Sequence, residues 1–265
     1  MRIGEIISDS IKYPISNWKN FLFLGLIVII GDLYSILAVA GIKSVLISIL
    51  GIVAFLFMIF RYGYALRVME SSTAGGKIIP ELNRWTEMFV DGIKVLVVAL
   101  VYIFPLIIIT IPMIIYIGFT SFSSGTGLNE TSFFRSLIIV FLVMGIYMLF
   151  VYPILLMSTV NMANNKKDIG AAFKFGAIKN IISNVGLGKF IGWYITTGVI
   201  YLLLTIFGYA LLAIFNLIHI KIIATVLFSL IIVPFAIIFL YRSSALIYLD
   251  GIKNDKTAAD EIAGE

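Results

Sequence analysis

The sequence contains no cysteine and a single histidine, His219. Without cysteine there is no disulfide, no thiolate nucleophile, and no iron–sulfur or cysteine-based zinc site. Catalytic motifs are also lacking. The segment Gly186-Leu187-Gly188-Lys189 ends like a phosphate-binding loop, but Ser183 and Phe190 replace the required glycine and the hydroxyl residue that would bind magnesium. We therefore expect no cofactor and a protein that is not an enzyme.

Charge is scarce as well, since 12% of the residues are charged and 61% are hydrophobic, with a mean hydropathy of +1.11. Charge-free runs extend over residues 95–129, 136–165, 190–220 and 222–241. A bilayer core about 30 Å thick needs roughly 20 apolar residues of helix. The chain is therefore predicted to lie in a lipid bilayer. Its net charge of +5 does not indicate nucleic acid, because the basic residues flank the apolar runs.

The apolar runs predict an all-α fold. Lipid offers no partner for backbone N–H and C=O groups, and runs this long suit helices better than the short alternating strands of a barrel. We expect a polytopic membrane helix bundle of six transmembrane helices, arranged as three hairpins in one domain, residues 1–250. The six predicted spans are Phe21–Ala40, Lys43–Tyr62, Ile93–Gly118, Arg135–Val160, Lys189–Leu217 and Lys221–Leu249.

The distribution of basic residues predicts the orientation. With six spans, sixteen of the 19 Lys and Arg residues fall on one side of the membrane. The other three are Lys43, Arg135 and Lys221. Cytoplasmic connections are enriched in Lys and Arg, so both termini are expected to be cytoplasmic, in a multi-pass protein of the cell membrane. The three tryptophans, Trp18, Trp85 and Trp193, are expected at the cytoplasmic boundary.

Amphipathic segments precede the odd-numbered spans and predict interfacial helices on the cytoplasmic side. The first extends from Ile3 until Pro14 ends it, the second starts at Pro80, and the third is capped by Asp168. Together with the hairpins they suggest a three-fold repeat over residues 1–70, 78–165 and 168–250. The alternative is that the bias in basic residues alone produces the similarity.

Two polar segments lie outside the predicted spans. The loop Phe119–Phe134 contains the sequon Asn129-Glu130-Thr131, which makes Asn129 a candidate glycosylation acceptor. The tail, residues 251–265, is acidic and is expected to be disordered in the cytoplasm.

Part of the chain resembles a known family. The residues that carry the resemblance are Gly63-Tyr64-Ala65-Leu66-Arg67-Val68, Pro80-Glu81, Trp85 and Glu87-Met88-Phe89-Val90-Asp91-Gly92-Ile93-Lys94. They are similar to the family called domain of unknown function 4013, polytopic membrane proteins common in archaea. The resemblance implies a membrane location and this architecture, and no activity or ligand residue. Leu82-Asn83-Arg84 stands where a second tryptophan is expected.

Asp32 is the only carboxylate within a predicted span. An aspartate at the bilayer centre costs about 2.5–3.5 kcal/mol, so an acid there is a candidate functional residue. In a hairpin that turns at Gly41 it would lie opposite Leu50 and Gly51, with Ser48 as the nearest hydroxyl. The alternative is that Asp32 lies in the outer half of the membrane and reaches water or headgroups.

Two prolines interrupt the third span, Pro105 and Pro112. In transporters, such breaks can line a binding site. More commonly a membrane proline bends a helix whose freed carbonyl finds another partner. An ion or substrate pathway would therefore be sought near Asp32, Ser48, Pro105 and Pro112.

Lipid headgroup contacts are expected at Arg61, Arg67, Trp85 and Lys94, which follow or precede spans on the cytoplasmic side. Arg67 and Glu70 are three residues apart and can pair on one helix. The alternative for the arginines is that they extend toward the interface and orient the span.

Three functions follow from these features. The first is a non-enzymatic membrane subunit or scaffold with an unidentified protein partner. The second is a transporter of an ion or small molecule, and the third is an intramembrane lipid-handling enzyme, disfavoured by the few polar residues within the spans. A cavity that reaches the middle of the bilayer and touches Asp32 would favour transport, whereas a solid core with a wide apolar outer face would favour a scaffold.

Overall fold

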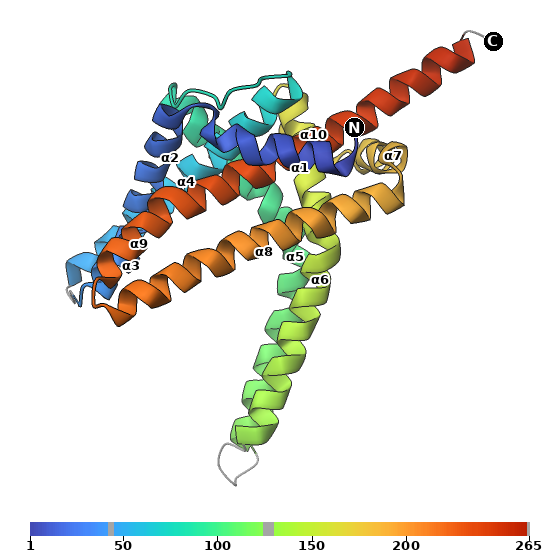
Figure 1. The fold of residues 1–265 in the computed structure, drawn as a ribbon. Coiled ribbons are helices and arrows are strands. Elements are labelled where there is room, and N and C mark those ends of the chain that lie inside the picture. The colour runs from blue at the N-terminus through green and yellow to red at the C-terminus, as the bar shows by residue number, and fades with distance from the viewer. Residues whose placement is uncertain (42–44, 124–129, 264–265) are drawn as a thin grey trace. The chain divides into compact units, whose positions relative to one another are not determined.

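The computed structural model describes residues 1–41, 45–123 and 130–263, without the side chains of residues 45–49, 120–123, 130–133 and 255–263 (Figure 1). Every regular element in these residues is helical. In chain order they are α1 (Ile3–Lys12), η1 (Tyr13–Ser16), α2 (Trp18–Gly31), α3 (Leu33–Val39), α4 (Val45–Thr73), α5 (Trp85–Ser123), α6 (Glu130–Asn164), η2 (Ile169–Phe173), α7 (Phe175–Val185), α8 (Leu187–Leu217), α9 (Lys221–Leu227), η3 (Phe228–Ile232) and α10 (Val233–Ala263). The labels η1 and η2 mark 3₁₀ turns, and η3 marks a π-helical turn.

Five helical segments in the described residues are long and apolar enough to cross a membrane: residues 50–73, 85–119, 134–164, 187–217 and 221–254. A sixth is obtained if the segments Ile3–Ser16 and Trp18–Gly31, bent by 83°, count as one span. The prediction of an all-α polytopic bundle is thus confirmed. The bend follows from Pro14, which lies in the tighter 3₁₀ turn η1, and from the extended backbone of Asn17, whose side chain caps α2.

The chain forms two compact units, Met1–Leu96 with Met157–Glu265, and Val97–Leu156. In the first unit the core surrounds residues 63–69 of α4, all of them buried. Tyr64 and Val68 pack there with Leu24 and Ile27 of α2 and with Ile238 of α10. This core joins α2, α4 and α10.

Helices α4 and α5 meet through two glycines. A Cβ atom on Gly63 would lie 1.8 Å from the carbonyl oxygen of Met88, and one on Gly92 would lie 2.0 Å from that of Ile59. Only glycine permits this approach of one backbone to the other. Gly63 and Gly92 of this crossing are among the residues that carry the family resemblance.

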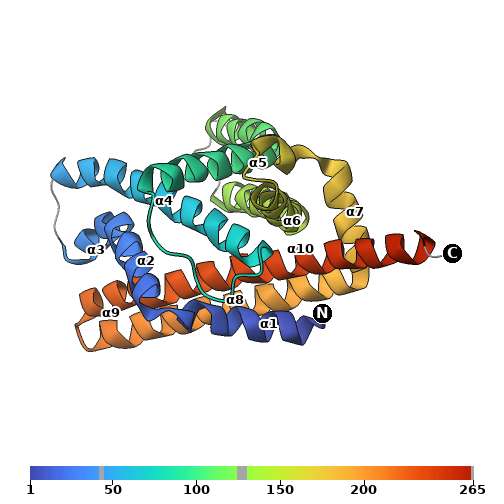
Figure 2. The ribbon, with the colours of Figure 1, turned by 90° about the horizontal axis from the view of Figure 1, so that it is seen from above.

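The last helix, α10, is packed along the first unit. It contacts α1, α4, α7 and α8, and Figures 1 and 2 both show α8 running beside it. Arg242 of α10 is buried, donates to Asp9 Oδ1 at 2.7 Å and lies 4.2 Å above the ring of Tyr13. This arrangement ties α1 and η1 to α10.

The second unit is a helical hairpin formed by the outer parts of α5 and α6. Tyr147 donates from its hydroxyl to the carbonyl oxygen of Tyr102 at 2.7 Å and so joins the two helices. Pro105 and Pro112 lie within α5, which continues past both as one helical element. Both prolines are exposed on the surface.

Several boundaries differ from the sequence-based expectation. The first span is divided at Asp32 into α2 and α3. No separate helix starts at Pro80. Instead α5 begins at Trp85 and continues into the span. The third amphipathic segment is capped by Asp168 as expected, through a bond from the Gly170 N–H, but it is split at Lys174 into η2 and α7.

Two further segments differ from the simplest expectation. Trp193 is completely buried and donates from Nε1 to Ser243 Oγ at 2.7 Å, so its indole packs in the protein core. The tail is not irregular, because α10 continues through residue 251 to Ala263. Asn129 lies outside the described residues. The three-fold repeat stays a prediction.

Candidate functional site

The break between α2 and α3 positions Asp32. Its backbone is neither helical nor extended, with φ −93° and ψ 3°, although its N–H still donates to the carbonyl oxygen of Val28 at 2.8 Å. Its carboxylate does not cap α3. Because one residue departs from helical geometry here, the side chain of Asp32 is directed away from the two helices that flank it.

A second irregularity faces this break. The π-helical turn η3 separates α9 from α10, and the Val233 N–H bonds to the carbonyl oxygen of Phe228, five residues earlier. Pro234 has no N–H, so it cannot donate to the carbonyl oxygen of Leu230 as a helical residue would. A Cβ atom on Gly25 of α2 would lie 2.3 Å from that oxygen. Glycine therefore lets α2 contact the turn where the backbone ladder is interrupted.

Ser229 joins the two irregular segments. Its hydroxyl donates to Asp32 Oδ2 at 2.7 Å, and the residue is 2% exposed. If η3 were a regular α-helix, the side chain of Ser229 would point in a different direction relative to α10. π-helical turns are frequent at functional sites, where they direct a side chain out of the regular register.

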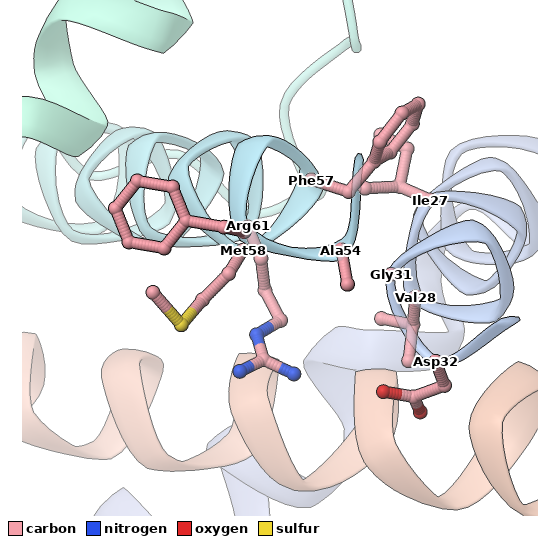
Figure 3. Close-up of a pocket in the computed structure, with 9 residues that line it drawn as sticks. Ile27, Val28, Gly31, Asp32, Ala54, Phe57, Met58 and Arg61 are labelled. Carbon is pink, nitrogen blue, oxygen red and sulfur yellow. The ribbon is translucent and has the colours of Figure 1, made fainter. Parts of the chain in front are cut away.

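A cavity of about 210 Å³ lies beside Asp32 (Figure 3). Its polar groups are the carboxylate of Asp32, from the α2–α3 break, and the guanidinium of Arg61, from α4. Figure 3 shows both side chains extending to the same side of the cavity. The remaining lining residues are Ile27, Val28, Gly31, Ala54, Phe55, Phe57 and Met58. We call this space the Asp32 cavity.

The charges of the Asp32 cavity are not joined to each other. Within the described residues, no ion pair within 4.0 Å includes Asp32 or Arg61. Arg61 has one aromatic neighbour, the ring of Tyr62, at 5.8 Å. A carboxylate and a guanidinium thus share one cavity within the apolar part of the chain. Such a cavity can bind a solute that carries charge.

The structure brings together only part of the predicted pathway. Asp32 lines the cavity, and Ala54 and Met58 of α4 lie across from it where Leu50 and Gly51 were expected. The side chain of Ser48 lies outside the described part of the chain. Pro105 and Pro112 belong to the second unit and are not among the residues that line the cavity.

Two of the four residues expected at lipid headgroups, Arg67 and Lys94, form hydrogen bonds within the protein. Arg61 lines the Asp32 cavity, and Lys94 donates from Nζ to the carbonyl oxygen of Lys167 at 3.0 Å. Arg67 is 6% exposed and donates to carbonyl oxygens of Asn83 and Arg84, the latter at 2.9 Å. Trp85 is exposed, and its ring lies 5.7 Å from that of Phe60.

Arg67 holds the loop that precedes α5. Tyr64 assists it, because its hydroxyl donates to the carbonyl oxygen of Pro80 at 2.9 Å. Asn83 and Arg84, which occupy the place of the expected tryptophan, supply the carbonyl oxygens that Arg67 binds. The expected pair between Arg67 and Glu70 is therefore wrong, since Arg67 is directed toward the loop.

Glu70 instead takes part in a cluster that we call the Lys167 triad, consisting of Lys167, Glu70 and Asp91. Lys167 Nζ lies 2.8 Å from Glu70 Oε2 and 2.9 Å from Asp91 Oδ2. Burial alone would lower the pKa of Lys167, but hydrogen bonds and attraction from the two carboxylates outweigh it and raise that pKa above the ordinary lysine value. The triad joins α4, the base of α5 and the turn after α6.

Ser229 is the site residue that sequence reasoning missed. The available signal was Pro234, five residues later in an otherwise uncharged run. A proline predicts a disturbed helix upstream of it, but the direction of Ser229 depends on the π-helical turn. The pairing with Asp32 spans 197 positions of sequence, which no local pattern encodes.

The fold and the cavity define the class of protein: an all-α integral membrane protein with five or six candidate spans in its described residues and a charged cavity between its helices. Residues 46–213 match the family described as protein of unknown function (DUF4013), which covers more than half of the chain. The chain belongs to this family, as the motif around Gly63 and Gly92 predicted. Comparisons with curated proteins and with solved structures give no match.

Proposed function

We propose that the protein binds a small charged solute in the Asp32 cavity and carries it through the membrane. The observation that supports this proposal is the presence of Asp32 and Arg61 in one cavity without an ion pair between them. Each charge is costly within a span. Ionisable residues that face a cavity within the membrane are characteristic of substrate and ion pathways.

A transport role accounts for the cavity better than catalysis does. Asp32 is the only carboxylate that lines the cavity. The opposite group is a guanidinium, which does not exchange protons at neutral pH. General acid–base catalysis needs a group whose pKa suits proton transfer near the working pH. The two charges are suited to recognition, and we propose a non-enzymatic protein.

The experiment is uptake into vesicles that contain the purified protein, with solutes of opposite charge offered in parallel. Asp32→Asn and Arg61→Gln are expected to reduce uptake of the transported solute at least about tenfold, because each removes one of the two recognition charges. Arg84→Gln and Glu87→Gln are matched controls, since those side chains are 72% and 58% exposed and pair with each other. Equal uptake by cavity and control variants would contradict the proposal.

A second function, a membrane subunit that docks a protein partner, is favoured by α8. Only 6% of the residues in its most apolar stretch of 18 residues are buried within the protein, whereas 44% are buried in the corresponding stretch of α4. A helix so poorly covered faces either lipid or another protein. Crosslinking from α8 in native membranes would distinguish the two, because a discrete adduct of higher mass is expected only if a partner covers it.

The orientation also belongs to the proposal. We infer from the positive charge distribution that both termini lie in the cytoplasm, and the 83° bend between the first helical segment and α2 supports an interfacial position for α1. Since the chain has no cysteine, single cysteines can be introduced without background. Labelling of Lys166→Cys by an impermeant reagent added outside intact cells would overturn this orientation.

A further inference from the structure

We propose that the solute bound in the Asp32 cavity is a small zwitterion, with its ammonium group at Asp32 and its carboxylate or phosphate group at Arg61. This inference rests on the proposed function and specifies its ligand. The shared chemistry is one positive and one negative group on a short skeleton. Two sources can supply it, a soluble amino acid or the headgroup of an ethanolamine phospholipid.

The charge content of the cavity selects this ligand class. A solute with one charge would neutralise either Asp32 or Arg61 and leave the other without an opposite charge in a largely apolar lining. A zwitterion satisfies both at once. Arg61 suits the anionic end, because a guanidinium binds a carboxylate or phosphate through two parallel N–H groups.

Ser229 prepares Asp32 for the cationic end. Its hydroxyl donates to Oδ2, and an ionised carboxylate can accept about four hydrogen bonds on its two oxygens. Asp32 is therefore held in one orientation and still has room to accept an ammonium group. The glycine at position 25 and the π-helical turn keep Ser229 within reach, so Ser229 is a positioning residue for the ligand.

The size of the cavity limits the ligand. Sites for drug-sized molecules have volumes of roughly 300–1,000 Å³, whereas this cavity has about 210 Å³. Its lining also includes Phe55, which is 53% exposed, so the cavity borders the outer surface of the span. A small amino acid fits within such a volume, and a phospholipid headgroup can enter while its chains remain in the bilayer.

The test compares three soluble probes built on the alanine skeleton: alanine itself, propionate, which lacks the ammonium group, and ethylamine, which lacks the carboxylate. Binding is measured by calorimetry on the full-length protein in nanodiscs of phosphatidylglycerol, which contain no zwitterionic lipid. Alanine is expected to bind at least about tenfold more tightly than either analogue. Arg61→Gln should abolish its advantage over ethylamine, and Asp32→Asn its advantage over propionate.

A second arm tests the lipid source. The protein is reconstituted in equal amounts of phosphatidylethanolamine and phosphatidylglycerol and examined by native mass spectrometry. Selective retention of phosphatidylethanolamine, lost in Asp32→Asn and Arg61→Gln but kept in Arg84→Gln, would identify a headgroup as the ligand. Selective binding in either arm supports the inference, and the arm that responds identifies the source.

Two outcomes overturn the inference, and they separate it from the proposed function. If propionate or ethylamine binds as tightly as alanine, and that binding is lost in the cavity variants, the zwitterion is wrong and the charged-solute function stands. If no probe and no lipid is bound in a way that depends on Asp32 or Arg61, both fail. Ser229→Ala, compared with the exposed Ser8→Ala, is expected to weaken alanine binding about threefold to tenfold.

Discussion

Charged side chains differ in their ion pairing between two regions of the first unit. In the Lys167 triad each carboxylate lies within 2.9 Å of the ammonium group, and the buried Arg242 and Asp250 likewise have ion-pair partners at 2.7 and 2.5 Å. In the Asp32 cavity a carboxylate and a guanidinium share a space without pairing. These two charges are the ones for which we propose a ligand.

The contrast predicts opposite consequences for stability. Charges that hold the helices together should be costly to remove, whereas charges kept for a ligand should be nearly neutral when removed. The glycine crossing of α4 and α5 lies in the same unit and is expected to show the largest loss of stability on substitution. The stability effects of both kinds of charge can be compared with it.

Gly63→Ala is expected to have the largest effect. The added Cβ would lie 1.8 Å from the Met88 carbonyl oxygen, so the helices must separate, at a cost of about 3 kcal/mol or more. The readout is the free energy of unfolding in mixed micelles. Gly51→Ala on the same helix is the control, because no atom lies within 4 Å of its added Cβ, and alanine there is expected to stabilise the helix slightly. Equal behaviour of the two variants would contradict the close crossing.

Lys167→Met is expected to have the second-largest effect on stability. It leaves Asp91, which is 4% exposed, without its cation. Breaking a buried pair costs roughly 3–5 kcal/mol, and because Glu70 is 44% exposed and Lys167 is only partly buried, we expect about 2 kcal/mol. Lys166→Met is the matched control, since Lys166 is the exposed neighbour with a similar positive φ. A loss of the same size in both variants would show that the triad contributes nothing.

The sequence predicted these two regions unequally. Asp32 was found because a lone carboxylate is conspicuous in a charge-free run, and the segment around Gly63 and Asp91 was found through the family resemblance. The direction of the Arg61 side chain was not predicted, because it depends on which helix lies beside α4. The burial of Trp193 was not predicted, because an indole at a span boundary commonly contacts the interface. Here Ser243, 50 residues later, accepts its N–H within the core.

Arg61→Met is expected to have a smaller effect, and of the other sign. Replacing an unpaired guanidinium by an apolar side chain of similar length removes a desolvated charge, so the free energy of unfolding should stay constant or rise by up to about 1 kcal/mol. The same variant should lose solute binding. If Arg61→Met destabilised the protein as strongly as Lys167→Met, Arg61 would be a structural charge and the contrast between the two regions would disappear.

The smallest expected effect is a pH dependence confined to the alkaline range. The carboxylates of Glu70 and Asp91 raise the pKa of Lys167 against the effect of burial, so the folded state binds the proton more tightly than the unfolded chain does. Stability from this group is therefore complete below the ordinary lysine pKa of about 10.4 and decreases as the pH rises through the raised value. Unfolding measured from pH 9.5 upward should show a steeper loss in the wild type than in Lys167→Met, because only the wild type has this proton to lose. Lys166→Met should keep the wild-type slope, and identical slopes in all three proteins would show that the ammonium group of Lys167 is not stabilised by its two carboxylates.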